Sequence, residues 1–401
     1  MYNVKTYQDP GEVRLLSAYP IIWLASWYPS RTSPVNGDFI QRHAEALARF
    51  LPLLVIHTIH DADLAHEVSY EMRSRGNLTE IILYFRHSGV LDSVPSKLQY
   101  NLRFHSYTKD LLRSLFLKYE KPKALHVHVP MKMGRIANWV QNKWGIPFLL
   151  SEHSSKYIGD GPDHFNRRSW LYRSGVKRIF TKALAVTNVS NAIAQVLATN
   201  FGRKDIEIIR NVVDTNLFHY KGRVANKPIR FLHVSTLTEQ KNFTSILKVF
   251  SDLYAIRQDF ELVVLGGERD ERYNTFQSAA WLNWVGIVDH HAVSDYMGQS
   301  DALVLFSWNE NFPCVIIEAL CAGMVVISSD VGGCAEAINK ENGIMVPPGD
   351  EIALYNTVNM LIDHFGRYNR EQISKTAALN FSFEKIGSDF LNLYRRKGLI
   401  S

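Results

Sequence analysis

Short apolar runs alternate with helical patterns along the first half of the chain. Six of these runs have the length and composition of buried strands: Pro20 to Ala25, Leu53 to Thr58, Ile81 to Phe85, Ala124 to Val129, Pro147 to Ser151 and Ala183 to Asn188. Strands that are separated by helices predict a parallel sheet whose connections are right-handed crossovers. The first half is therefore expected to form a doubly wound α/β domain.

The second half repeats this pattern. Its apolar runs are Ile229 to Ser235, Glu261 to Gly266, Leu282 to Val285, Ala302 to Phe306 and Met324 to Ser328. The pattern predicts a second doubly wound domain. Ligands of open parallel sheets bind beyond the carboxyl ends of the strands. We therefore expect two Rossmann-like domains that face one another across a ligand-binding cleft.

The boundary between the two patterns falls near Asn211 to Phe218, which is followed by the polar segment Lys221 to Lys227. We place the hinge there, which gives domains at 1–215 and 216–380 and a final segment at 381–401. The final segment is predicted to be a helix with an apolar side formed by Phe383, Ile386, Phe390, Leu391 and Tyr394.

The length and composition of the chain indicate an ordered globular protein with two domains. The 401 residues suit two domains, and 46% hydrophobic with 21% charged residues is typical of an ordered globular protein. No apolar run reaches the roughly 18 to 20 residues of a membrane span, and Met1 to Ser17 lacks the pattern of a signal peptide, which favours the cytoplasm. Cys314, Cys321 and Cys334 form no Cys-x-x-Cys pair, so we expect reduced, packed thiols.

The formal charge of +6 favours anionic partners, among them nucleotide diphosphates and anionic lipid headgroups. Nucleic acid is not expected, because the basic residues form no recognisable binding module. Basic residues are dense from Lys97 to Lys123, where they accompany an apolar stripe of Tyr100, Phe104, Tyr107, Leu111, Leu112, Leu115 and Phe116. Two interpretations stay open: a core-packed helix with a solvated basic face, which we favour, and peripheral docking on an anionic membrane.

The segment between residues 301 and 320 gives the clearest indication of a binding site. A predicted strand, Asp301 to Phe306, is followed by a loop that contains Glu310 and by a helix that contains Glu318, with Pro313 suited to the first helical turn. The junction of a strand end and a helix N-terminus exposes backbone N–H groups, which favours diphosphate binding.

Two carboxylates flank this junction. Glu310 could accept hydrogen bonds from sugar hydroxyls and Glu318 two from a ribose, each worth roughly 1.5 to 3 kcal/mol. The alternative is that Glu310 is a solvated loop residue and Glu318 a helix-surface charge. Glu318 lies within an apolar run, where an unpartnered carboxylate would be costly.

Glu310 and Glu318, with Phe312 and Pro313 between them and Ala319 after them, resemble the signature of family 4 retaining glycosyltransferases, also called glycosyl transferases group 1. The resemblance implies the GT-B fold, in which a last helix crosses back to the N-terminal domain. It also implies a nucleotide diphosphate sugar as donor and no metal cofactor.

The other motifs of this family follow in order. Gly37 lies in a segment, residues 36–43, that resembles the family's glycine loop, and His153 follows a strand end where the family often has a histidine near the transferred sugar. Lys241 ends the loop that follows the strand Ile229 to Ser235 and would neutralise the diphosphate. Thr236 stands where the family commonly has an arginine, so we consider Arg210 and Arg269 as substitutes.

The resemblance thus implies a full set of site residues. The catalytic residues would be His153, Glu310 and Lys241. The donor-binding residues would be Gly37, Ser235, Thr236, Lys241, Gly266, Val285, Ile287, Glu310, Asn311, Phe312 and Glu318.

Two other patterns could be taken for metal sites. Asp61-Ala62-Asp63 spells an Asp-x-Asp motif, but it lies far from the expected donor site, and we interpret it as a polar loop. His126 and His128 alternate on a strand, so both would point to one face, and we expect them to pack at the domain interface.

We expect a retaining glycosyltransferase that moves a sugar from a nucleotide diphosphate, UDP favoured over GDP, to a hydroxyl of a glycan or lipid-linked acceptor. Attack on the same face, with His153 orienting the donor sugar, fits better than double displacement, because no carboxylate nucleophile is evident. Surface polysaccharide or glycolipid assembly, with peripheral association at the inner face of a membrane, fits this chemistry. The alternatives are an inactive GT-B binding protein, to which Thr236 points, and a nucleotide-sugar epimerase.

Overall fold

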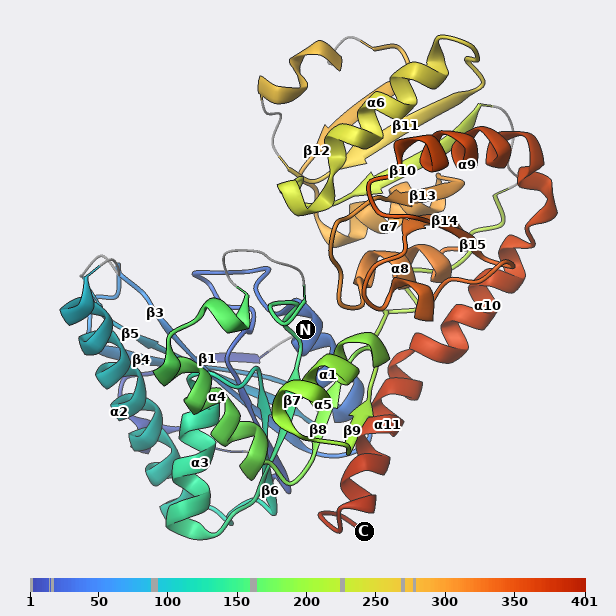
Figure 1. Cartoon of the computed structure of the whole chain (residues 1–401). Helices are drawn as coiled ribbons and strands as arrows, with labels where there is room; N and C mark the ends of the chain where they lie inside the picture. The colour runs from blue at the N-terminus through green and yellow to red at the C-terminus, as the bar shows by residue number, and fades with distance from the viewer. Residues whose placement is uncertain are drawn as a thin grey trace. The chain divides into compact units, whose positions relative to one another are not determined.

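The computed structural model of the chain describes residues 3–13, 15, 18–87, 93–158, 164–223, 228–267, 271–276 and 279–401. Internal contacts divide the chain into two compact units, each with its own sheet (Figure 1). The first unit comprises Met1–Val189, Ala194–Ile209 and Ile386–Ser401; the second comprises Ser190–Ile193 and Arg210–Lys385. Both units have the predicted α/β class of fold.

The first sheet has nine strands in the order β1-β4-β5-β3-β2-β6-β7-β8-β9. In chain order they are β1 (Asn3–Tyr7), β2 (Ile21–Ala25), β3 (Leu53–His60), β4 (Val68–Arg75), β5 (Leu78–Phe85), β6 (Ala124–His128), β7 (Phe148–Glu152), β8 (Val186–Asn188) and β9 (Ile206–Ile208). From β5 to β9 in this order the strands are parallel; six of them, β5, β3, β2, β6, β7 and β8, correspond to the predicted runs, whereas β9 at the edge was not predicted.

The edge formed by β4 and β1 is antiparallel and was not predicted. Strand β4 carries Glu71, Arg73 and Arg75, so it lacks the apolar run of a buried parallel strand. It pairs with β5 through a hairpin whose turn contains Gly76, with a φ of 57°. Only tertiary pairing identifies such a polar segment as part of the sheet.

Helices cover both faces of the first sheet (Figure 1). In chain order they are η1 (Pro10–Glu12), α1 (Asp38–Ala48), α2 (Val94–Lys118), α3 (Met133–Trp144), η2 (Phe165–Arg167), α4 (Trp170–Lys182) and α5 (Asn191–Phe201). Helices α2, α3 and α4 follow one another along one face, and α1 packs on the other face against β3 and β5.

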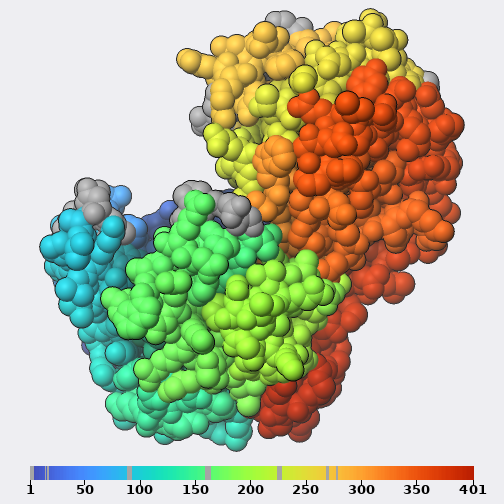
Figure 2. All heavy atoms as spheres, in the orientation of Figure 1, coloured from blue at the N-terminus to red at the C-terminus, as the bar shows by residue number. Residues whose placement is uncertain are grey.

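Helix α2 contains the basic segment whose role was left open. Its predicted apolar stripe packs into the core: Tyr100, Phe104, Leu111, Leu112, Leu115 and Phe116 are buried, and Tyr107 is half-buried. The outer surface of α2 (cyan in Figure 2) also exposes Val94, Leu98 and Leu102. The core-packed interpretation therefore holds for the stripe, while membrane docking stays a prediction.

The second sheet has six strands in the order β12-β11-β10-β13-β14-β15, all parallel. They are β10 (Ile229–Val234), β11 (Phe260–Leu265), β12 (Leu282–Gly286), β13 (Ala302–Leu305), β14 (Val325–Ser329) and β15 (Gly343–Val346). Most of these strands are continuous apolar runs, as expected for parallel strands that are covered on both faces.

The helices of the second unit lie on the two faces of its sheet (Figure 1). They are η3 (Glu239–Lys241), α6 (Phe243–Tyr254), η4 (Glu271–Phe276), α7 (His290–Gly298), α8 (Cys314–Cys321), η5 (Cys334–Glu336), α9 (Glu351–His364), η6 (Phe365–Arg367) and α10 (Arg370–Phe381). Helices α6 and α9 pack together on one face, and α7 and α8 cover the other.

The last helix, α11 (Phe383–Arg396), is tied to the first unit from Ile386 onward. The indole N–H of Trp23 donates to the Tyr394 hydroxyl at 2.9 Å, and that hydroxyl lies 2.6 Å from Nδ1 of His126. His126 Nε2 lies 2.8 Å from Ser151 Oγ. Because Tyr394 accepts from Trp23, its own proton goes to His126, and the network continues into β7.

Candidate functional site

Some of the predicted site residues belong to the first unit and the others to the second. Gly37 and His153 belong to the first unit, and the others belong to the second. Those of the second unit lie at or beyond the carboxyl ends of β10, β11, β12 and β13, or in α8. This is the edge of an open parallel sheet at which ligands bind.

Lys241 and Glu310 come together although 69 residues separate them. The Lys241 ammonium donates to Glu310 Oε1 at 2.6 Å, and the Ser307 hydroxyl donates to the same oxygen at 2.8 Å. Lys241 follows β10 and Ser307 follows β13, which are neighbours in the sheet. Both side chains of the ion pair are largely buried, with 20% and 9% exposed. The pair places a positive and a negative charge side by side at the sheet edge.

The backbone of the loop that carries Glu310 packs closely against two glycines, Gly332 and Gly333. Gly332 has a φ of 54°, and a Cβ there would overlap the backbone carbonyl oxygen of Glu310. The N–H of Gly333 donates to the Asn311 carbonyl at 2.7 Å. Only glycine permits this close approach, so the position of Glu310 depends on a loop that lies 22 residues further along the chain.

Glu318 lies in α8 and is 5% exposed. Its Oε1 accepts from Nε2 of His290 at 3.2 Å, and the ring of Phe218 packs 4.8 Å from the His290 ring. His290 begins α7, where Asp289 is the N-cap. Sequence reasoning missed His290, because His290 and His291 follow a turn and resemble a solvated helix start.

The ends of β10 and β11 are in close backbone contact. Ser235 follows β10, and a Cβ on Gly266, whose φ is 84°, would overlap its carbonyl oxygen. Leu237 has a positive φ of 54°, which is unusual for a branched side chain. A Cβ on Gly267 would lie 2.5 Å from Leu237 Cδ1. The two loops thus fix one another, and Thr236 lies exposed between Ser235 and Leu237.

Thr236 stands where the family commonly has an arginine. Of the two arginines considered as substitutes, Arg210 lies within the described residues. Arg210 pairs with Glu336 at 2.9 Å and lies over the Phe312 ring at 4.8 Å from its centre. Although burial opposes the charge of Glu336, backbone N–H groups and Arg210 hold its pKa below the ordinary value. Arg210 therefore lies beside the loop before α8 and is engaged with a carboxylate. Arg269 lies outside the described residues.

Asn311 and Phe312 are largely buried within the second unit. The Asn311 side chain accepts from Ser190 Oγ at 2.8 Å, and the Phe312 ring lies 5.9 Å from that of Phe381. Their side chains thus serve packing, and we expect a ligand to meet the backbone of this loop. Helix α8 begins two residues later, and the N–H groups of its first turn have no partner within the helix.

Val285 and Ile287 lie at the outer edge of the second sheet. Val285 is half-buried in β12, whereas Ile287 follows the strand and is 73% exposed. Gly286 between them has a φ of 91°, and its carbonyl accepts from the N–H of Gly266 at 2.7 Å. These positions surround the end of β11 and present both apolar surface and backbone polar groups.

In the first unit, Gly37 is the N-cap of α1 and has a φ of 75°. A Cβ there would lie 2.5 Å from the backbone carbon of Trp27, so the glycine is required for packing of the loop against the end of β2. This local reason accounts for the residue without any ligand, and its role in donor binding stays a prediction.

His153 follows β7, is half-buried, and packs against the buried side chains of His43 and His128. Its ring stacks on that of His128 at 5.4 Å with an interplanar angle of 7°, and its Nε2 lies 3.1 Å from His128 Nδ1. His43 packs beside it at 5.8 Å. Burial, with neighbouring histidines, lowers the pKa of His153 well below its usual value. The imidazole is therefore neutral near pH 7.

The two patterns that resembled metal sites have structural explanations. Asp61 pairs with Arg31 at 2.6 Å and accepts from the N–H of Asp63, which makes the Asp-x-Asp segment a polar loop. His126 and His128 do point to one face of β6, where their rings stack at 4.8 Å. In the described ranges, no group of three or more His, Cys, Asp or Glu residues could hold a metal ion.

The three cysteines are free thiols in the described structure. Cys321 and Cys334 are buried, and burial raises the pKa of Cys334 to about 12. Neither is a nucleophile at neutral pH.

Comparison with known proteins identifies the class to which this fold and site belong. The family model "Glycosyltransferase Family 4" matches residues 40–217, and "Glycosyl transferases group 1" matches residues 214–378. The two matches together run from residue 40 to residue 378, and the chain belongs to this family. It is a glycosyltransferase of the retaining class.

Particular relatives agree with this assignment. TuaC of Bacillus subtilis, named as a teichuronic acid biosynthesis glycosyltransferase, is 24% identical over 396 residues, which cover 92% of this chain and 94% of TuaC. Sucrose-phosphate synthase of Thermosynechococcus elongatus has a TM-score of 0.74 at 20% identity, covering 95% of this chain and all of that one. HepE of Anabaena, in complex with UDP and glucose, has a TM-score of 0.67 at 14% identity, covering 94% and 99%. The two solved structures support the GT-B fold.

Proposed function

We propose that the enzyme transfers a sugar from a nucleotide diphosphate sugar, with UDP favoured over GDP, to a hydroxyl of a glycan or lipid-linked acceptor. The reaction would serve the assembly of a surface polysaccharide or glycolipid. The observation that carries the proposal is the Lys241–Glu310 pair beside the N-terminus of α8, with Glu318 buried on that helix. UDP in the HepE structure and the role given in the name of TuaC support it.

In this proposal, each of these groups of the second unit has a part in the reaction. Lys241 has three N–H donors, so it can keep Glu310 and still reach a diphosphate oxygen. Together with the N–H groups at the start of α8, it would stabilise the charge on the leaving diphosphate. Glu310 would accept from hydroxyls of the sugar, and Glu318 from those of the ribose.

Retention follows from attack on the face that the leaving group departs from. The bond between the anomeric carbon and the phosphate oxygen breaks, and its electron pair leaves with the nucleoside diphosphate. The acceptor oxygen forms the new bond, and its proton passes to the departing phosphate oxygen. His153, which is neutral, would orient the donor sugar, since an imidazole with so low a pKa is a weak base.

The proposal places the enzyme in the cytoplasm, peripheral at the inner face of a membrane. None of the helices that the structure describes is long and apolar enough to cross a bilayer. Val94, Leu98 and Leu102, spaced four residues apart on α2, would supply an apolar contact with lipid.

A thermal-shift panel of UDP, GDP, ADP and their sugar conjugates tests the donor site. Ligand at about 100 times its Kd adds roughly 2.7 kcal/mol, which raises Tm by a few degrees. We expect UDP to raise the Tm of the wild type but not of Glu318→Ala. Glu371→Ala is the matched control, because Glu371 is an exposed helical carboxylate of the same unit, paired only with Lys375 among the described residues.

The outcomes separate the parts of this proposal. A shift with GDP alone would overturn the choice of base and keep the site. A shift that survives in Glu318→Ala would remove Glu318 from the ribose site. No shift with any nucleotide would contradict donor binding and favour an inactive binding protein.

A further inference from the structure

Glu318 is a carboxylate on the otherwise apolar helix α8. Its neighbours Ile317 and Ala319 are fully buried, and Glu318 itself is 5% exposed. Nε2 of His290 lies 3.2 Å from Glu318 Oε1. Because an ionised carboxylate only accepts hydrogen bonds, Nε2 carries the proton of this one. His290 therefore holds one oxygen of the carboxylate to which the proposed function gives the ribose.

The ring of His290 is itself held in place, although 42% of its side chain is exposed. Asp289 caps α7, so His290 lies in the first turn of a fixed helix. The ring of Phe218, which is 1% exposed, packs 4.8 Å from the His290 ring. The Ser294 hydroxyl of α7 donates to the Leu217 carbonyl at 2.7 Å and docks the helix on the segment that carries this phenylalanine. A histidine held in this way can set the direction of a neighbouring side chain.

The contact lies where the nucleoside part of a donor is expected. Helix α7 begins three residues after Ile287, one of the predicted donor-binding residues at the end of β12. Helices α7 and α8 cover the same face of the second sheet (Figure 1). His290 thus joins the segment that follows β12 to the carboxylate on α8.

We propose that His290 is a positioning residue that orients Glu318 and so sets the preference of the donor site for a ribose with both hydroxyls. The inference rests on the proposed function, since it takes Glu318 to accept from the ribose. A glutamate has several rotatable bonds, and ordering them on binding reduces affinity. With Oε1 held by His290, the carboxylate is oriented before the nucleotide arrives, so this loss is avoided.

Calorimetric titration of the full chain with UDP, 2′-deoxy-UDP and 3′-deoxy-UDP tests the inference. The readout is the ratio of the Kd of each deoxy analogue to the Kd of UDP, because a general loss of stability would not change this ratio. A hydroxyl bound to a charged acceptor should make the ratio about tenfold or more in the wild type, for at least one analogue. Glu318→Ala should remove the discrimination.

His290→Phe separates the hydrogen bond from the packing of the ring. It keeps an aromatic ring against Phe218 and removes the N–H donor. UDP binding should weaken about three- to tenfold, while the analogue that lacks the accepted hydroxyl loses little. His290→Gln, which places an N–H at a similar reach, should restore most of the ratio. In the Glu318→Ala background, His290→Phe should have no further effect, because it acts through that carboxylate.

One control is the neighbouring histidine. His291 is exposed on the same helix, and His291→Ala should leave the ratio at its wild-type value. An equal loss in His291→Ala and His290→Phe would overturn the specific role of His290.

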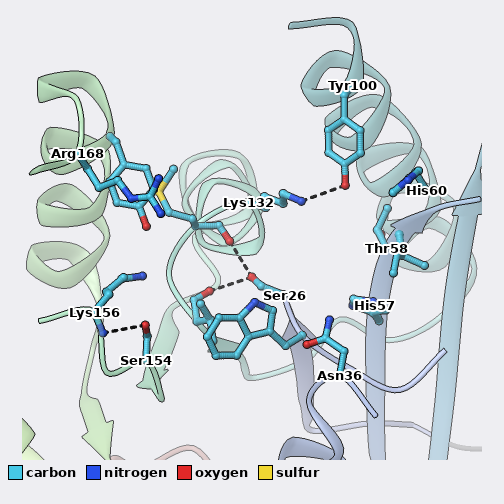
Figure 3. A pocket seen from close by; sticks show the side chains of 15 residues that line it. Ser26, Asn36, His57, Thr58, His60, Tyr100, Lys132, Ser154, Lys156 and Arg168 are labelled. Atoms are coloured by element: carbon cyan, nitrogen blue, oxygen red, sulfur yellow. Dashed lines mark hydrogen bonds between the residues drawn. The ribbon is translucent and has the colours of Figure 1, made fainter. Parts of the chain in front are cut away.

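A second control concerns another place where an anionic nucleotide could bind. The first unit has a cavity of about 500 Å³, none of whose lining residues belongs to the second unit. Figure 3 shows Lys132 on one side of this space and Lys156 and Arg168 on the other. A nucleotide bound there would respond to Lys132→Met and not to His290→Phe. We expect the opposite result, and a loss of UDP binding in Lys132→Met alone would overturn the inference.

The outcomes separate this inference from the proposed function. Discrimination that is lost in Glu318→Ala but kept in His290→Phe would overturn the role of His290 and leave the donor site standing. A further loss from His290→Phe in the Glu318→Ala background would also overturn positioning through Glu318. Discrimination that survives in Glu318→Ala would remove the ribose contact and the inference with it. Where the thermal-shift panel selects GDP, the same titration uses GDP and its deoxy analogues, and no binding of either nucleotide would overturn the proposed function itself.

Discussion

The two units contain sheets of the same class but present different chemistry at the carboxyl ends of their strands. In the second unit, Lys241 and Glu310 form an ion pair. The loops beside this pair approach one another closely at Gly332 and Gly266, where a Cβ would overlap a backbone carbonyl oxygen. In the first unit, a cavity lined with cations lies near a cluster of buried, neutral histidines. The comparison shows that the same edge of an open parallel sheet carries a close ion pair in one unit and basic side chains beside neutral histidines in the other.

The largest expected effect is acid instability of the first unit. Burial lowers the pKa of the histidines concerned, to about 3 for His126 and about 4 for His57. Unfolded histidines titrate near 6.5, so below that pH the unfolded state binds protons that the folded state does not. Stability is thus fully present above pH 6.5 and is lost as the pH falls toward 4, by roughly 2 kcal/mol per buried histidine at pH 5.

Hydrogen exchange of the backbone amides, followed by mass spectrometry at pH 7.5 and 5.5, measures the stability of each unit separately. After correction for the intrinsic exchange rates, we expect the first unit to lose protection at pH 5.5 before the second. The first unit has six such histidines, His57, His60, His105, His126, His128 and His153, whereas His233 is the one in the described part of the second. Glu80, whose pKa is raised by burial, acts in the opposite sense but is a single group. Earlier loss of protection in the second unit would contradict the comparison.

Next in size is the loss of the Lys241 ammonium. Lys241→Met should lower kcat by roughly a hundred- to a thousandfold, because it removes charge stabilisation at the leaving diphosphate. The control is Lys248→Met, which breaks a lysine–glutamate pair with Glu351 in the same unit but at a lysine that is 61% exposed. Initial rates of nucleotide release measure both variants. Equal losses in the two would show that Lys241 acts only through general stability.

A smaller effect is expected from the glycine beneath Glu310. Gly332→Ala should destabilise the protein by roughly 2 to 4 kcal/mol, because its Cβ would overlap the Glu310 carbonyl at a positive φ. Gly145→Ala in the first unit is the control: its φ is 70°, but a Cβ there meets nothing within 4 Å, so only about 1 kcal/mol is expected. Urea unfolding of both variants checks the difference, and similar losses would reject the close-packing argument.

The smallest effect should come from Tyr394→Phe. Removing the hydroxyl leaves the Trp23 N–H and His126 Nδ1 without their partner in a fully buried network, at about 1 to 3 kcal/mol. The midpoint of thermal unfolding should fall, with donor-site thermal shifts unchanged. Tyr254→Phe, on α6 of the second unit, is the control. It should leave the midpoint nearly unchanged, whereas an equal fall would show that the hydrogen bonds of Tyr394 to Trp23 and His126 are not the cause.

Much of the fold was predictable because buried parallel strands are apolar runs that are visible in the sequence. The strands near Leu53, Ala124 and Phe260 were found in this way, whereas β4 was missed because its side chains are polar. Glu310 and Glu318 were recognised because both lie in one short motif. His290 was missed, because its contact with Glu318 spans 28 residues and no local pattern marks it.

The sequence by itself determined the class of protein, the two repeating α/β patterns and the short motifs, since these depend on residues that are neighbours along the chain. The tertiary structure alone decided which distant charges meet. It paired Lys241 with Glu310 and placed Lys132, Lys156 and Arg168 around one cavity. The physical reason is that parallel strands bring their carboxyl ends to a common edge, so loops that are far apart in the sequence become neighbours only when the sheet has formed.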